Sequence, residues 1–156
     1  MELRLRHEHW WVSYALSEAI DEIGGETVPR SWDQRHAAAF GTNLTLPHGW
    51  SASLGGSFHT GWPTTEVTGV DLIIGPRNRS RFPSYFRLDL RTSKRITTRR
   101  GELEFIAEIF NATNRKNVCC IANFEPVVHD NGEIEVIRDR RYWAPIVPSL
   151  SVRWQF

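Results

Sequence analysis

Apolar and polar residues alternate along most of this chain with a period of two residues. The clearest run spans residues 50–62, "WSASLGGSFHTGW", in which every second residue from Trp50 to Trp62 falls on one mostly apolar face and serines dominate the other. Such alternation is typical of a β-strand with one buried face. The run is about twice the usual length of a strand in a globular protein, and it is long enough to cross a bilayer, which takes about 9–11 tilted residues.

Five other segments show the same alternation, for example "SYFRLDLRTSKRI", where Phe86, Leu88 and Leu90 lie opposite Arg87, Asp89 and Arg91. An amphipathic helix fits poorly, because the period is two and several glycines interrupt the segments. The pattern predicts an all-β fold: an antiparallel up-and-down meander of about seven long strands at residues 2–7, 9–21, 34–46, 50–62, 84–97, 102–114 and 148–156.

The connections between these strands alternate between short and long. Tight turns follow Leu46 and Ile96, whereas long loops are expected at residues 22–33, 63–83 and 115–147. In a meander, this order gathers the tight turns at one end and the loops at the other, as in outer-membrane barrels. The sequence therefore predicts a partial, open section of a large transmembrane β-barrel, with its C-terminus on the tight-turn, periplasmic side and its loops outside.

The polar face of residues 84–114 contains charges that pair in one register. If Thr97 faces Glu102 across the turn, Arg95 faces Glu104 and Arg91 faces Glu108. Opposite charges directly across a ladder stabilise a sheet by roughly 0.2–1 kcal/mol each. These four side chains are candidates for a charge ladder facing the barrel lumen; the alternative is a solvated sheet face with chance pairs. Asp89, with its arginine neighbours, fits the same ladder better than an acid/base pair.

Composition adds few constraints. The chain has 156 residues and a formal net charge of +1, which gives no reason to expect nucleic acid as a partner. The mean hydropathy of −0.39 does not argue against a membrane barrel, whose strands are apolar on one face only. The residues "MELRLRHEHW" lack the apolar core of a signal peptide, so we expect either a cytoplasmic protein or the tail of a longer chain.

Sites for chemistry are not evident. The two cysteines, Cys119 and Cys120, are adjacent, have no second pair with which to form a zinc site, and are interpreted as a local feature of a loop. The six histidines have no metal-site spacing, and no phosphate loop or nucleophile elbow is present. We therefore expect no enzyme activity, no cofactor and no metal.

Several segments together resemble a known family. These are "VPRSWDQRHAAAFGTNLTLPHGWSASLGGSFHTGWPTT", "RFPSYFRLDLRTSKRI", "GELEFIAEIFNATNRKNVCC" and the closing "PSLSVRWQF". In this order they look like the C-terminal strands of a TonB-dependent outer-membrane receptor. The resemblance covers nearly the whole chain, from about residue 9 to 156, and its specificity comes from the ordered set.

The resemblance implies that residues 1–156 are the C-terminal part of a plugged barrel of about 22 strands. Such receptors lie in the outer membrane of Gram-negative bacteria and take up scarce ligands such as ferric siderophores. Their partners would be the rest of the barrel and plug, outer-membrane lipid and lipopolysaccharide, the barrel-assembly machinery, and TonB through the plug. Because this sequence lacks the signal peptide, TonB box, plug and N-terminal strands, we expect a gene fragment or one piece of a split receptor.

The resemblance also assigns roles to residues. Leu150, Val152, Trp154 and Phe156 would form the terminal assembly signal, which is captured by edge pairing. Aromatic residues near the predicted strand ends would form girdles at the membrane interfaces; they are Trp11, Trp50, Trp62, Tyr85, Phe86, Trp154 and Phe156. Loop arginines are candidates for contacts with an extracellular ligand or with lipopolysaccharide, or are simply solvated; they are Arg77, Arg79, Arg81, Arg138, Arg140 and Arg141.

Two other classes remain open. One is a soluble all-β binding module, in which the apolar side chains would meet inside a compact sandwich. The other is a small passive porin-like or adhesin barrel, which needs an even number of strands and a signal peptide of its own.

Overall fold

The computed structural model describes residues 2–5, 8–68 and 73–156, and these residues form strands and turns with a single helical turn. The elements in chain order are β1 (Glu2–Leu5), β2 (Glu8–Leu16), β3 (Ile20–Ile23), β4 (Glu26–Pro29), β5 (His36–Leu46), η1 (Pro47–Gly49), β6 (Trp50–His59), β7 (Pro63–Thr64), β8 (Val67–Thr68), β9 (Ile73–Ile74), β10 (Ser80–Arg81), β11 (Tyr85–Thr98), β12 (Gly101–Phe110), β13 (Val118–Val128), β14 (Ile134–Tyr142) and β15 (Val147–Gln155).

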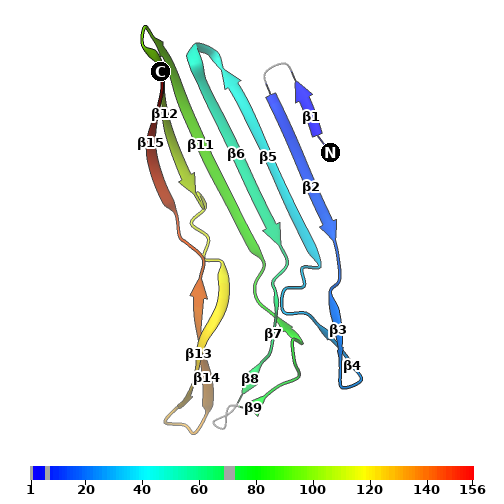
Figure 1. Cartoon of the computed structure of the whole chain (residues 1–156). Coiled ribbons are helices and arrows are strands. Elements are labelled where there is room, and N and C mark those ends of the chain that lie inside the picture. The colour runs from blue at the N-terminus through cyan, green and yellow to red at the C-terminus, as the bar shows by residue number, and fades with distance from the viewer. Residues whose placement is uncertain (1, 6–7, 69–72) are drawn as a thin grey trace.

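Seven strands form one open antiparallel sheet, in the order β1-β2-β5-β6-β11-β12-β15 (Figure 1). Spatial order follows chain order, so the sheet is an up-and-down meander, and the predicted all-β fold is confirmed. The sheet does not close among the described residues: β1 and β15 each pair on one side only.

Tight turns join the strands at one end of this sheet. Between β5 and β6 the chain reverses over Pro47–Gly49, where His48 and Gly49 both have positive φ angles. Between β11 and β12 two arginines form the turn, with Thr98 facing Gly101. The C-terminus lies at this same end (Figure 1). The alternation of short and long connections is therefore present as predicted.

The opposite end, which we call the loop end, comprises residues 17–35, 60–68, 73–84 and 111–146. The three long connections predicted as loops here contain strands. Residues 22–33 belong mostly to the β3–β4 hairpin, residues 63–83 include four two-residue strands, and most of residues 115–147 forms the long β13–β14 hairpin. Hairpins let long connections satisfy their backbone groups by themselves.

The predicted second strand, residues 9–21, is also interrupted. It ends at Leu16, and the chain resumes as β3 at Ile20, because Asp33 and Arg35 accept hydrogen bonds from the backbone NH groups of Ala19 and Ser17. Residues 6–7 of the predicted first strand and residues 69–72 of the predicted loop lie outside the described residues.

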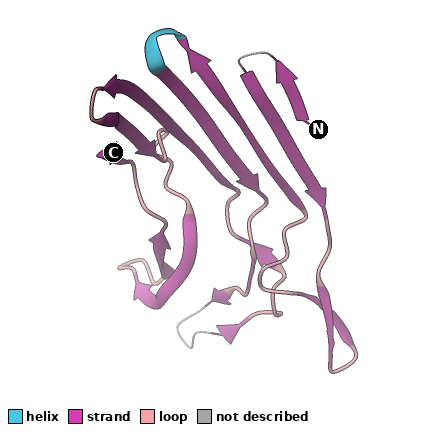
Figure 2. Ribbon diagram, turned by 45° about the horizontal axis from the view of Figure 1, so that its top comes forward, coloured by secondary structure: helices cyan, strands magenta, loops and turns pink. Residues whose placement is uncertain are grey.

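A hydrophobic core is nearly absent from the part of the chain that is described. Only Val28, Val67 and Ile106 are buried apolar side chains there. Figure 2 shows the reason: the large sheet is a single curved layer, and the loop-end hairpins extend away from it instead of folding over it. None of the described residues forms a helix long and apolar enough to cross a membrane.

Candidate functional site

The two faces of the seven-stranded sheet differ in chemistry. The pairing registers place the even-numbered residues of β2, β5, β6, β11 and β15 on the same side as the odd-numbered residues of β12. We call this side the outer face. The inner face is formed by the alternate residues of the same strands. Leucine, valine and aromatic side chains dominate the outer face, and serine, asparagine and charged side chains dominate the inner one.

Large apolar side chains of the outer face are exposed, including Tyr14, Phe58, Leu90 and Phe105. Side chains on neighbouring strands of the outer face also pack closely against each other. A Cβ at Gly56 would come within 2.3 Å of the Phe40 ring, so glycine at this position makes room for the ring on the neighbouring strand. The apolar face is therefore formed without any layer on top of it.

Of the predicted assembly signal, Leu150, Val152 and Trp154 lie on this face in the edge strand β15, and Phe156 follows the end of that strand. Leu150 is 86% exposed and Phe156 is fully exposed, and Val152 and Trp154 are exposed as well. Trp154 and Phe156 contact each other edge to face, with ring centroids 5.8 Å apart. Because β15 pairs only with β12 in the described chain, its other edge presents free backbone groups.

A groove of about 450 Å³ crosses the outer face near the tight-turn end and is lined mainly by Trp50, Phe105, Leu150 and Val152. Lys94 is the only lysine or arginine on the outer face between β2 and β15. Its ammonium lies 5.3 Å from the Trp50 ring centroid and donates to the His48 carbonyl in the tight turn. The lysine thus keeps its apolar stem on the sheet and its charge at the end of the strand, as snorkelling side chains do.

The inner face is concave. A hollow of about 460 Å³ is bordered by side chains from β2 through β15, among them Trp11, Asn43, Arg91, Glu108 and Ser149. This hollow spans all the strands from β2 to β15, whereas the groove on the outer face spans only those from β6 to β15, so the sheet curves toward its polar face. The polar face is therefore the inside of the curve and the apolar face the outside.

The predicted register of the charge ladder is confirmed: Arg95 faces Glu104 and Arg91 faces Glu108. Arg91 and Glu108 form an ion pair of 2.9 Å. Glu104 instead bonds sideways across the sheet. It accepts a 2.8 Å hydrogen bond from Ser93 and lies 3.4 Å from the Arg153 guanidinium.

This sideways bonding extends the ladder over four strands. Ser51 on β6 contacts Ser93 on β11 at 2.8 Å, Ser93 bonds Glu104 on β12, and Glu104 pairs with Arg153 on β15. Arg95 forms an ion pair with Glu102, at 3.8 Å. Sequence reasoning missed Arg153, although its position opposite Glu104 follows from extending the same register to β15.

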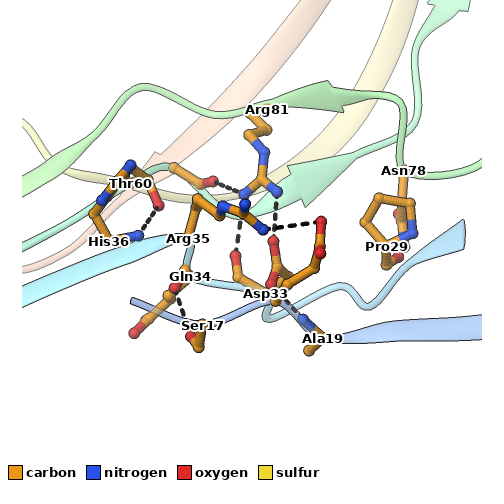
Figure 3. Close-up of polar contacts among 12 residues, drawn as sticks. Ser17, Ala19, Pro29, Asp33, Gln34, Arg35, His36, Thr60, Asn78 and Arg81 are labelled. Atoms are coloured by element: carbon orange, nitrogen blue, oxygen red, sulfur yellow. Dashed lines mark hydrogen bonds and ion pairs between the residues drawn. The ribbon is translucent and has the colours of Figure 1, made fainter. Parts of the chain in front are cut away.

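At the loop end, Asp33 organises three segments (Figure 3). Its side chain is only 2% exposed, accepts a 2.7 Å hydrogen bond from the Ala19 NH and forms an ion pair with Arg81. The Arg81 guanidinium also donates to the carbonyls of Asp33, at 3.2 Å, and Gly61, at 3.0 Å. Arg81 thus joins the chain before β5 to the chain after β6.

The environment of Asp33 affects its ionisation. Burial alone would raise the pKa of this carboxyl, but the hydrogen bond from Arg81, the hydrogen bond from the Ala19 NH and the charges of Arg81 and Arg35 together lower the pKa below its ordinary value. Asp33 is therefore a carboxylate in the folded protein at neutral pH, and it functions as a structural anion.

The six predicted loop arginines do not form one site. Arg81, Arg138 and Arg140 line a small cavity of about 60 Å³ between β10 and the β13–β14 hairpin. Arg77 borders a separate cavity beside the β3–β4 hairpin, and Arg141 pairs with Asp139 at 3.8 Å. Arg79 is exposed. Arg81 is already paired with Asp33. Arg138 and Arg140 of β14 are therefore the arginines lining this cavity that remain available to a ligand.

Part of the predicted aromatic girdle is wrong. Trp11 lies on the inner face, where its ring covers Gly41, because the register pairs Trp11 with Gly41. Tyr85 also lies on the inner face and stacks on His59, with centroids 4.7 Å apart; Trp62 stacks on the other side of that ring at 5.2 Å. Of the remaining predicted members, Trp50, Phe86 and Trp154 are on the outer face.

Three buried asparagines that sequence reasoning missed order the loop end: Asn78 and Asn111 join segments within it, and Asn117 joins it to β11. Asn117 donates to and accepts from the backbone of Phe86, Asn111 donates to the carbonyls of Arg115 and Ala144, and Asn78 donates to the Pro29 carbonyl. Asn111 and Asn78 have positive φ angles, which asparagine tolerates better than most residues. The repeated asparagines of "FNATNRKN" were the available signal.

The interpretation of Cys119 and Cys120 as part of a loop is wrong, because both lie in β13. Both are free thiols. In the described ranges no three histidine, cysteine or acidic side chains gather as metal ligands would.

Comparison with known proteins finds no family model, no curated protein and no solved structure that matches this chain.

Proposed function

We propose that this chain forms the C-terminal strands of a TonB-dependent receptor barrel in the outer membrane, which takes up a scarce ligand such as a ferric siderophore. The observation that carries the proposal is the exposed apolar outer face, which lies on a sheet whose concave inner face is polar. This is the arrangement of a transmembrane barrel wall, with lipid outside and a polar lumen inside.

A soluble binding module would need a second layer over the outer face, since monomeric soluble proteins rarely expose apolar patches larger than a few hundred Å². The described chain supplies no such layer. Lipid is an alternative cover that requires no further protein. The position of Lys94, with its charge drawn to the tight-turn end, fits a membrane boundary near that end.

The open edges of the sheet also support a segment of a larger barrel. Unsatisfied backbone groups are costly in lipid, so a spanning sheet has to close on itself. Strands preceding β1 would pair with its free edge and would meet β15 on the far side of the barrel. The apolar residues at alternate positions from Leu150 to Phe156 favour recognition of β15 by the barrel-assembly machinery.

The charge distribution is compatible with an anionic ligand. Arg138 and Arg140 reach a shared cavity at the loop end, and the inner face below it carries Arg91 and Arg87. Arginines in this position would attract a ferric chelate or bridge lipopolysaccharide phosphates.

The proposal is tested in cells that produce the complete receptor. Deleting residues 154–156 removes the terminal aromatic residues, whereas Gln155→Ala leaves Trp154 and Phe156 in place. We expect the deletion to abolish both the outer-membrane abundance of the protein and the TonB-dependent uptake of radiolabelled ferric siderophore, and Gln155→Ala to preserve both. Recovery of the unaltered chain as a folded monomer in the soluble fraction would contradict the proposal.

A further inference from the structure

Cys119 and Cys120 lie where a β-bulge changes the direction of their side chains. Val118 faces Tyr142 and Cys120 faces Arg141, so two steps along β13 are matched by one step along β14 and Cys119 is the extra residue. In a regular strand, successive side chains point to opposite faces. A bulge re-aims a side chain, and here the two Sγ atoms are 2.7 Å apart.

We propose that Cys119 and Cys120 form a reversible dithiol–disulfide site, which is oxidised by thiol–disulfide exchange with a small or protein disulfide. The geometry of the site comes from the bulge and is independent of ligand uptake, whereas its oxidation in the cell rests on the proposed outer-membrane location. The loop end would face an oxidising medium in an outer-membrane protein, where disulfides form and persist.

The two thiols have different roles in the exchange. Cys120 is exposed and Cys119 is half-buried. Hydrogen bonding to Cys120, and then burial, raises the pKa of Cys119 above its ordinary value. We expect the Cys120 thiolate to attack one sulfur of the oxidant R–S–S–R, giving a mixed disulfide and releasing RS⁻.

The neighbouring thiol then completes the exchange. Cys119, after losing its proton to solvent, attacks the Cys120 sulfur of the mixed disulfide and expels the second RS⁻. The two cysteines lose two electrons in total, and the oxidant is reduced to two thiols. Adjacent Cα atoms are about 3.8 Å apart, below the usual disulfide range, and strained disulfides are the labile ones, so thiols should readily reverse the bond.

The test uses the full chain folded in detergent micelles and treated with glutathione disulfide. Trypsin releases both cysteines on one peptide, residues 117–138, because no lysine or arginine lies between Lys116 and Arg138. After the remaining thiols are alkylated, we expect this peptide to lose both alkylation sites, to carry no glutathione, and to regain both sites after dithiothreitol.

Single variants separate the two steps. Cys119→Ser leaves the proposed attacking thiol and should accumulate the glutathione mixed disulfide; Cys120→Ser should accumulate it more slowly. Far-UV circular dichroism checks that each variant folds. The proposal is overturned if the unaltered folded chain keeps its glutathione adduct, or if both of its thiols stay alkylatable at glutathione disulfide concentrations that modify Cys119→Ser.

Discussion

The seven-stranded sheet and the loop end both contain few buried apolar side chains, and they are held together in different ways. In the sheet, backbone ladders are continuous, polar side chains bond across the inner face, and the outer face has no covering layer. At the loop end, short hairpins are joined by single buried polar side chains such as Asp33, Asn111 and Asn117.

This difference indicates where each region draws its stability. The buried polar side chains at the loop end bond backbone or charged groups of other segments, so removing a single partner leaves unpaired groups in a dry site. In the sheet the Arg91–Glu108 pair is half-exposed and individually weak. The outer face depends on the solvent that surrounds it. The comparison can be tested by substitutions in each region, which we give from the largest expected effect to the smallest.

The largest effect is expected at the loop end. Arg81→Met should destabilise the folded protein by about 3–5 kcal/mol, because it leaves the buried Asp33 carboxylate without its charged partner. Arg79→Met, two residues away and exposed, should change stability by about 0.5 kcal/mol or less. Urea unfolding of the membrane-assembled protein measures both, and equal effects would remove the special role of Asp33.

The same ion pair predicts a pH dependence. The folded-state pKa of Asp33 is lowered. The stability that the Asp33 carboxylate contributes is therefore fully present above the unfolded pKa of about 3.9, and it is lost as the pH falls through the folded-state pKa. The unaltered protein should therefore lose stability relative to Asp33→Asn below about pH 4. A difference between the two proteins that stays constant down to pH 2 would show that Asp33 does not titrate in this way.

The next effect is expected on the outer face. Leu90→Arg should destabilise the membrane-assembled protein by about 2–4 kcal/mol, the cost of an arginine at the middle of the lipid face of a barrel. Ser149→Arg places the same side chain opposite Glu108 on the inner face and should change stability by about 0.5 kcal/mol or less. Urea titration in phospholipid vesicles compares the two variants. A larger cost for Ser149→Arg would reverse the assignment of the faces.

The smallest effect is expected for the charge ladder. In a double-mutant cycle of Arg91→Ala and Glu108→Ala, the coupling energy should be about 0.2–1 kcal/mol, because both side chains are half-exposed. It should decrease in 1 M salt, where the Debye length falls to about 3 Å. A coupling above about 2 kcal/mol would mean that the pair is desolvated in the assembled barrel.

The sequence was a good guide to the sheet because its strands are long and strictly alternating. Period two fixes which residues share a face, and the tight turn between Ile96 and Leu103 fixes the register, so the pairing of Arg91 with Glu108 could be predicted. The β13–β14 hairpin was missed although Asp130, Asn131 and Gly132 are a turn signal, because the bulges of β13 obscure its alternation.

Contacts between distant segments were beyond sequence reasoning. Asp33 and Arg81 are 48 residues apart, and no local pattern connects them. Trp11 was assigned to a girdle by its position near a strand end. The deciding fact is the register that sets Trp11 against Gly41, and that register could not be read from one strand alone.

The central claim is that lipid surrounds the outer face, and nitroxide accessibility along β6 tests it most directly. Single cysteines at positions 51–54 and 57–58, in a background of Cys119→Ser and Cys120→Ser, would be spin-labelled in the membrane-assembled protein. We predict that labels at 52, 54 and 58 collide preferentially with oxygen, which concentrates in lipid, and that labels at 51, 53 and 57 collide with a water-soluble nickel chelate. Preferential nickel access at positions 52, 54 and 58, or no alternation at all, would contradict the account.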